Sequence, residues 1–215
     1  MIAIVDYGVG NLFSLKSSLS AIGVDVIVTA DKELLQSADQ IILPGVGAFG
    51  DAAEKLRKTG LDICLKELAN SGKPLLGICL GMQLLFEKSY EYGCHEGLGL
   101  IKGSVKPIAD VIPSDYKAFD SYKLVFAENE TVNSPVMNLE TRMWGDNNRI
   151  KRLDNSKEYS LNYSLFDNDC VYFVHSYYAT DCKEHTIAST EYGAILTASV
   201  ANKNVYGCQF HPEKS

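Results

Sequence analysis

One cysteine stands in a setting that could make it a nucleophile. In Gly77-Ile78-Cys79-Leu80-Gly81, two glycines frame Cys79 between an apolar run and a helical pattern. A sharp turn there would push the thiol out of a sheet, and the glycines would relieve the crowding. The start of a helix favours a thiolate, and the backbone N–H groups that follow can hold an oxyanion. The alternative interpretation is an inert, buried cysteine in a tight turn.

A nucleophilic thiol needs a base, and His211 is one candidate among the four histidines. It ends an apolar run, and the carboxyl ends of parallel strands are where sites in α/β proteins assemble. Pro212 stops this strand, and Glu213 points the same way as His211 if the backbone stays extended. His175 also lies in a predicted strand, so position alone does not rank the two histidines. Cys79, His211 and Glu213 therefore form one possible catalytic set, and His175 stays open as the alternative base.

These residues must be positioned by a scaffold, and the first half of the chain predicts one. Apolar runs at residues 2–7, 40–43 and 73–78 are typical of buried strands. Helical spacing follows at residues 12–22, 50–70, with a break at Gly60, and 81–88. Strands and helices that alternate at this pace predict an α/β fold with a mostly parallel central sheet and helices on both faces.

The last part of the chain predicts a different kind of pairing. Strand patterns recur at residues 171–178, 186–191, 195–200 and 205–210, and Asn202-Lys203-Asn204 is typical of a hairpin turn. We therefore expect antiparallel strands added to the parallel sheet. Residues 106–169 show little periodicity and predict only short strands.

Composition narrows the class of protein further. The chain has 215 residues, with 20 basic and 27 acidic residues and a net charge of -7, which argues against a nucleic-acid surface. Its apolar runs are too short to span a membrane, and no secretory signal is visible, so we expect a cytoplasmic protein with reduced thiols. No metal-ligand spacing occurs. The five cysteines other than Cys79 are expected to be buried.

Five motifs together resemble a known family. Residues 77–83 (Gly-Ile-Cys-Leu-Gly-Met-Gln) and 210–213 (Phe-His-Pro-Glu) resemble the two signatures of the class I glutamine amidotransferases. Residues 6–11, 43–49 and 172–178 narrow the similarity to the glutaminase subunits of imidazole glycerol phosphate synthase, in histidine biosynthesis. The resemblance covers roughly residues 1–105 and 171–215. It implies a single domain over residues 1–215 with a flavodoxin-like sheet.

The resemblance also implies roles and a partner. Cys79 would attack the glutamine carboxamide, His211 would be the base, and Glu213 would orient His211. The oxyanion hole would be formed by Gly45, Val46, Gly47 and Leu80. The glutamine-binding wall would contain Gln83, His175, Ser176 and Tyr177. Ammonia would pass to a (β/α)8-barrel cyclase subunit, in a heterodimer that forms imidazole glycerol phosphate and AICAR. The resemblance implies no cofactor, metal, nucleic acid or membrane.

Two departures from the family keep alternatives open. The family's Pro-His-Met-Gly-Trp-Asn-like segment is absent; the single tryptophan lies within residues 142–147, in a stretch (residues 103–169) that is longer than usual. This stretch leaves open an amidotransferase subunit that feeds a surface-sugar amidation enzyme. A non-catalytic activating scaffold is a further alternative. The chain stops two residues after Glu213, where the family continues into a helix, so we expect exposed apolar surface where that helix would pack.

Overall fold

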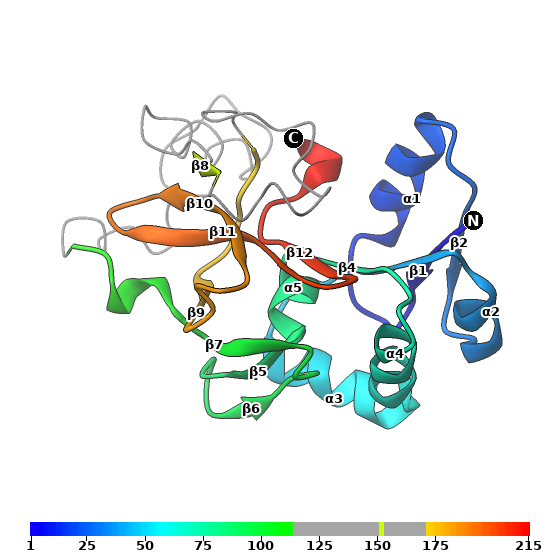
Figure 1. Ribbon diagram of the computed structural model, residues 1–215, viewed down its shortest axis with the longest axis horizontal. Helices are drawn as coiled ribbons and strands as arrows, with labels where there is room; N and C mark the ends of the chain where they lie inside the picture. Colours follow the sequence, from blue (N-terminus) through cyan, green and yellow to red (C-terminus); the bar gives the residue numbers. More distant parts are fainter. Residues whose placement is uncertain (114–150, 153–170) are drawn as a thin grey trace, which may run out of the picture.

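The computed structural model describes residues 1–113, 151–152 and 171–215, and Figure 1 shows their arrangement. The elements of the first half are β1 (Ile2–Val5), α1 (Leu12–Ala21), β2 (Val26–Thr29), α2 (Lys32–Ser37), β3 (Gln40–Leu43), α3 (Phe49–Thr59), α4 (Leu61–Asn70), β4 (Leu75–Ile78), α5 (Leu80–Leu84), β5 (Phe86–Ser89), β6 (His95–Glu96), β7 (Ile101–Pro107) and η1 (Ile108–Asp110). Those that follow are β8 (Lys151–Arg152), β9 (Tyr177–Thr180), β10 (Thr186–Glu191), β11 (Ile195–Asn202), β12 (Val205–Cys208) and η3 (Pro212–Lys214).

The larger sheet joins both ends of the chain. Its strand order among the described residues is β2-β1-β3-β4-β12-β11-β10-β8. The first five strands in this order are parallel, in the flavodoxin-like arrangement, and β11, β10 and β8 extend the sheet in antiparallel fashion. Both the parallel sheet and its antiparallel addition are therefore confirmed. The predicted hairpin is present as well, because β11 and β12 pair directly across a turn in which Lys203 has a φ of 54°.

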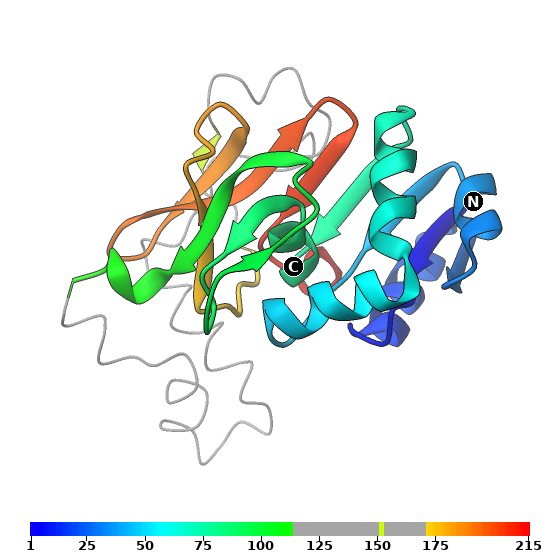
Figure 2. The same cartoon turned by 90° about the horizontal axis from the view of Figure 1, so that it is seen from below.

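Helices cover both faces of this sheet. Successive side chains of a strand point to opposite faces, and in the parallel strands both sets are apolar and must be buried. In β1, Ala3 and Val5 pack into the apolar core that contains Leu35 of α2 and the buried residues of α3 and α4. Ile4 faces the other way, into the cluster with Leu15 of α1. Figure 2 shows α3 and α4, in cyan to teal, together on one side of the sheet. Each fully buried leucine or isoleucine contributes about 2 kcal/mol to this packing.

The helix predictions are confirmed except at one place. Residues 50–70 form two helices, because Gly60 takes a left-handed φ of 65° and ends α3. Residues 81–88 were predicted to be one helix, and this is wrong: α5 ends at Leu84, and Phe86 begins β5. Phe86 is completely buried and pairs with Ile101 of β7 in a smaller sheet of order β6-β5-β7-β9. This tertiary pairing overrides the local helical pattern.

The strand predicted at residues 171–178 is also wrong in its bounds. Only Tyr177–Thr180 forms a strand, β9, which pairs with β7. The backbone of Tyr172 is engaged elsewhere: its carbonyl oxygen accepts from His211 N–H at 2.9 Å, and its N–H donates to Ser215 Oγ at 3.0 Å. This segment therefore lies along the end of the chain instead of inside a ladder.

The remaining expectations have mixed outcomes. Cys64, Cys182 and Cys208 are buried free thiols, but Cys94 is exposed in the turn before β6, so the expectation of burial is wrong there. Cys170 and the tryptophan segment lie outside the described residues. Phe13 on α1 is 82% exposed, but whether its surface belongs to a further helix stays a prediction. Within the described part of the chain, no helix is long and apolar enough to cross a membrane.

Candidate active site

Figure 1 shows that α5 follows directly after β4. Cys79 lies in the turn between them, at the carboxyl edge of the parallel strands. Its φ of 54° is left-handed, which costs about 1–3 kcal/mol for a residue with a side chain. Both flanking glycines are required by space. A Cβ on Gly81 would lie 1.8 Å from the carbonyl oxygen of Leu43, and one on Gly77 would lie 2.6 Å from that of Gly81. The sharp turn expected around a nucleophile is therefore present.

The pairing of β12 with β4 brings the last residues of the chain to the same edge. Cys79 N–H donates to the carbonyl oxygen of Cys208 at 2.8 Å. Three residues further on, His211 is buried, and its Nδ1 donates to Oε1 of Glu213 at 2.9 Å. The expectation that extended backbone aligns this pair is wrong. Residues Pro212–Lys214 form the 3-10 turn η3, which folds the carboxylate back onto the ring.

Opposing effects set the protonation of this pair. Burial lowers the pKa of His211, but hydrogen bonds to Cys79 and Glu213 outweigh it and raise that pKa to about 9. Burial raises the pKa of Glu213, yet the hydrogen bond from His211 brings it below its ordinary value. The structure thus brings together the three residues predicted to be catalytic. A charged imidazolium between a carboxylate and a sulfur is the state reached when a thiol has given its proton to the ring.

The predicted oxyanion segment runs alongside the turn at Cys79. A Cβ on Gly45 would lie 2.8 Å from Gly81 N and 2.9 Å from Leu80 Cβ, so the segment and the start of α5 are in contact. Val46 continues from there and is 46% exposed. Gly47 follows with a left-handed φ of 91° and open space around its Cα. The site is therefore packed tightly at Gly45 and open at Gly47.

Tyr7, to which the sequence assigned no role, anchors this segment. It is buried just beyond β1, and its hydroxyl donates to the carbonyl oxygen of Pro44 at 2.7 Å. The same hydroxyl would lie 2.9 Å from a Cβ on Gly45. Burial, with a smaller effect of the nearby Cys79, raises the pKa of Tyr7, so the group stays a donor at physiological pH. A signal was available, because β1 and β4 are both parallel strands whose carboxyl ends meet at one edge.

The predicted glutamine-binding wall is joined at one backbone carbonyl oxygen, that of Tyr177. Gln83 is buried on α5, and its Nε2 donates to the carbonyl oxygen of Tyr177 at 3.1 Å. His175 Nδ1 donates to the same oxygen at 2.9 Å, and burial lowers the pKa of His175 to about 4. Ser176 is exposed between them. These four residues form one connected group, held mainly by a single carbonyl.

Two further polar residues were missed by the sequence reasoning. Gln209 is completely buried, and its Nε2 lies 3.6 Å from Cys79 Sγ. It precedes His211 by two positions, and the alternation of an extended segment would have placed both on one face. Glu91 is partly buried, and its Oε2 accepts from Phe49 N–H at 2.6 Å. No sequence signal marked Glu91, because it lies in a turn after β5.

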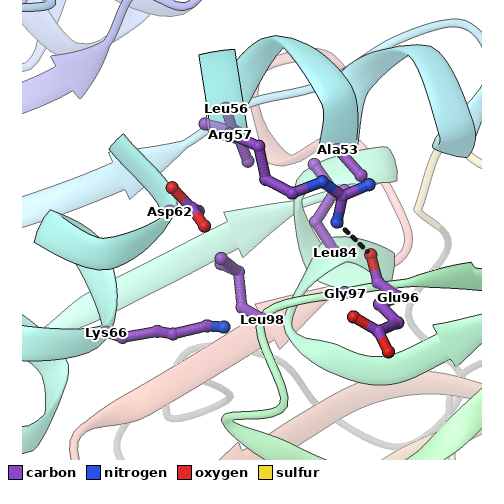
Figure 3. Close-up of a pocket in the computed structure, with 9 residues that line it drawn as sticks. All are labelled: Ala53, Leu56, Arg57, Asp62, Lys66, Leu84, Glu96, Gly97 and Leu98. Carbon is purple, nitrogen blue, oxygen red and sulfur yellow. Dashed lines mark hydrogen bonds between the residues drawn. The ribbon is translucent and has the colours of Figure 1, made fainter. Parts of the chain in front are cut away.

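Two hollows lie near these elements. One, of about 610 Å³, is lined by residues on both sides of the start of α3 and by the turn before β6, including Ala48, Gly50, Glu91, Tyr92 and His95. It begins directly after the oxyanion segment. The other, shown in Figure 3, has a volume of about 100 Å³ between α3, α4 and β6. Its two basic and two acidic side chains offset each other, and none of the predicted site residues lines it, so we assign it no part of the site.

Comparison with known proteins gives one family throughout. Residues 3–215 match the family described as glutamine amidotransferase class-I. The chain is 46% identical over 216 residues to imidazole glycerol phosphate synthase subunit HisH of Sulfurimonas denitrificans, covering 100% of this chain and 91% of the relative. It is 43% identical to the protein of the same name from Oceanobacillus iheyensis, covering 100% and 92%.

Solved structures agree on the fold. A structure described as glutamine amidotransferase superposes with a TM-score of 0.64 at 17% identity, covering 99% of this chain and 91% of the other. PurLQS from Thermotoga maritima gives a TM-score of 0.64 at 18% identity, covering 99% and 87%. These similarities support the arrangement of elements, whereas the closer sequence relatives bear on the reaction.

Proposed function

The chain belongs to the class-I glutamine amidotransferase family, and we propose that it is the glutaminase subunit of an imidazole glycerol phosphate synthase. It would hydrolyse glutamine to glutamate and ammonia and supply the ammonia to a cyclase subunit with a (β/α)8 barrel. One observation carries the chemistry: the pairing of β12 with β4 brings the buried His211–Glu213 pair to the strained turn at Cys79.

In the proposed reaction, the Cys79 sulfur attacks the carboxamide carbon of glutamine, and the π electrons of the carbonyl move to its oxygen. The oxyanion lies between the Leu80 N–H and the segment of Gly45, Val46 and Gly47. When the tetrahedral species collapses, the C–N bond breaks, and His211 delivers its proton to the departing nitrogen. Ammonia leaves, and a thioester remains on Cys79.

The second half of the reaction returns the enzyme to its starting state. A water molecule gives a proton to the now neutral His211 and attacks the thioester carbon. The C–S bond then breaks, glutamate leaves, and the sulfur recovers a proton from the ring. Glu213 holds the ring with Nδ1 protonated, so that Nε2 is the atom that exchanges protons with substrate and sulfur.

The α-ammonium group of glutamine needs a carboxylate, and Glu91 is the candidate. It borders the larger hollow, directly after the oxyanion segment. The pKa of Tyr177 of the wall is raised by burial and, to a smaller extent, by the charge of Glu91. Burial raises the pKa of Glu91, although the hydrogen bond from Phe49 N–H opposes this. A bound ammonium group would compensate the buried charge.

A single substitution tests the nucleophile. In the complex with its cyclase subunit, Cys79→Ala is expected to abolish glutamine-dependent turnover and to leave ammonia-dependent turnover intact. Cys94→Ala, which removes an exposed thiol, is the matched control and should leave both activities unchanged. Full glutamine-dependent turnover by Cys79→Ala would show that the assignment is wrong.

The partner is tested separately. Pull-down with this chain as bait is expected to recover the cyclase subunit. Recovery of sugar-modifying enzymes instead would favour the surface-sugar amidation alternative. The identities of 41–46% to proteins named HisH over the whole chain favour the first outcome.

A further inference from the structure

A buried glutamine beside the nucleophile has no part in the roles assigned so far. Gln209 follows β12 and has no exposed surface. Its Nε2 lies 3.6 Å from Cys79 Sγ, within the range of a hydrogen bond to sulfur. Its Oε1 accepts from Nε2 of Gln83 at 3.0 Å. The side-chain amide therefore bridges the nucleophile and α5.

The direction of these hydrogen bonds follows from one carbonyl group. The carbonyl oxygen of Tyr177 can only accept, so the atom of Gln83 that faces it at 3.1 Å must be the amide nitrogen. The same nitrogen faces Gln209, whose near atom must then be the oxygen. The nitrogen of Gln209 is consequently turned toward Cys79. The amide chain Tyr177–Gln83–Gln209–Cys79 thus ends with an N–H donor on the sulfur.

We propose that Gln209 is a further catalytic residue of this glutaminase, which donates a hydrogen bond to the Cys79 thiolate, and that Gln83 is a positioning residue that fixes the amide of Gln209. The proposal rests on the proposed role of Cys79 as the nucleophile. A hydrogen bond to a charged acceptor is stronger than one to a neutral acceptor, so the donor favours the thiolate over the thiol. It also fixes the direction of the sulfur between Gln209 and His211.

This assignment changes the expected role of Gln83. Both hydrogens of its amide nitrogen are committed, one to Tyr177 and one to Gln209. Only its Oε1 is left for the substrate. Since the carbonyl oxygen of Tyr177 also accepts from His175 Nδ1, the wall and the nucleophile share one set of hydrogen bonds.

The test measures Cys79 without glutamine, so that substrate binding cannot affect the result. Purified chain is treated with iodoacetamide at about pH 7 and about pH 10, and labelling of the Cys79 peptide is followed by mass spectrometry. Gln209→Met, which preserves much of the volume and removes the donor, should slow labelling at the lower pH roughly tenfold. At the higher pH, where the thiol ionises in either protein, the rates should agree.

Two other variants make the test specific. Gln83→Met should slow labelling in the same direction, and the double variant should be no slower than Gln209→Met, because both act through one donor. Asn202→Leu is the matched control: it removes an amide that donates to the carbonyl oxygen of Leu100, remote from the sulfur, and should not change labelling. Folding of each variant is checked by circular dichroism; if Gln209→Met does not fold, Gln83→Met decides.

The outcomes separate this inference from the proposed function. An unchanged rate in Gln209→Met at pH 7, or an equal loss at both pH values, overturns the donor role. If Cys79→Ala also abolishes glutamine-dependent turnover, only the amide chain has failed. If Cys79→Ala keeps that turnover, the proposed function has failed, whatever the labelling shows.

Discussion

Placing one methyl group at Gly45 should move the proposed oxyanion hole away from the proposed nucleophile, Cys79. A Cβ at this position would meet Gly81 N at 2.8 Å, Leu80 Cβ at 2.9 Å and the hydroxyl of Tyr7 at 2.9 Å. Ordinary contacts of a Cβ begin near 3.4 Å, so the segment must retreat by about 0.5 Å. Two of these three atoms belong to the rigid start of α5, which cannot yield as a flexible side chain would.

The size of the effect follows from the narrow range in which oxyanion donors work. They must lie about 2.7–3.1 Å from the oxyanion, so a retreat of about 0.5 Å removes a donor from that range. Losing one donor costs about 3 kcal/mol in the transition state, which corresponds to a rate loss of roughly 10²-fold. Gly45→Ala should therefore reduce glutamine-dependent kcat by about two orders of magnitude.

The assay compares two ammonia sources in the complex with the cyclase subunit. Glutamine-dependent turnover should fall in Gly45→Ala, whereas turnover with added ammonium should not. Gly72→Ala is the control: its φ of 93° makes alanine strained, but nothing lies within 4 Å of the added Cβ, and the position is a turn after α4. A Gly45→Ala protein with full glutamine-dependent turnover, or with both activities lost at a normal melting temperature, would refute the reasoning.

Three further outcomes are expected. Tyr7→Phe removes the hydroxyl that donates to the carbonyl oxygen of Pro44. The free energy of unfolding, measured by chemical denaturation, should fall by about 1 kcal/mol, and glutamine-dependent kcat should fall about tenfold. A loss of stability without a loss of kcat would show a purely structural role. Glu91→Gln should raise the KM for glutamine at least tenfold with kcat nearly unchanged, measured by steady-state kinetics; a change in kcat alone would contradict ammonium binding. Although burial lowers the pKa of His211, the hydrogen bonds to Cys79 and Glu213 raise it in the folded protein to about 9, above its unfolded value of about 6.5. Protonated His211 therefore contributes about 3 kcal/mol to the free energy of unfolding, fully below pH 6.5, and this contribution is lost as the pH rises through 9. Urea denaturation at pH 6 and pH 10 should show this loss, and His211→Gln should reduce it; an equal loss in both proteins would remove His211 as the cause.

Local signals predicted much of this fold. The glycine pair around Cys79, the break at Gly60 and the turn at Lys203 are visible in sequence, because each depends on backbone conformations that glycine or a short polar turn allows. Short continuous apolar runs predicted the parallel strands, because both faces of these strands are buried. What depends on neighbours distant in sequence was not visible. Phe86 begins a strand only because Ile101 is beside it.

In the candidate site as well, local motifs were visible in the sequence and contacts between distant residues were not. Motifs predicted the nucleophile and the base, and the parallel pairing of β4 with β12 brings these two predicted residues to one edge of the sheet. The geometry of Glu213 was predicted for the wrong reason, because a 3-10 turn and not extended backbone places its carboxylate. Tyr7 holds Pro44 through one hydrogen bond, whereas Gln209 joins Gln83 to Cys79 through two. Strand order and alternation indicate the edge at which these residues lie, but neither pattern identifies their hydrogen-bond partners.

The left-handed backbone of Cys79 lowers the stability of the fold at the residue that the proposed reaction needs. Glycine would take the same conformation without strain, so a lineage that no longer needed the reaction could relieve the strain by replacing the whole Cys79 side chain with hydrogen. Natural drift would therefore erode this position first in a scaffold that only activates a partner. This chain has the costly residue at the turn, with both supporting glycines and a buried histidine–carboxylate pair beside it. The strain at the turn is thus an argument that this residue serves turnover and not assembly alone.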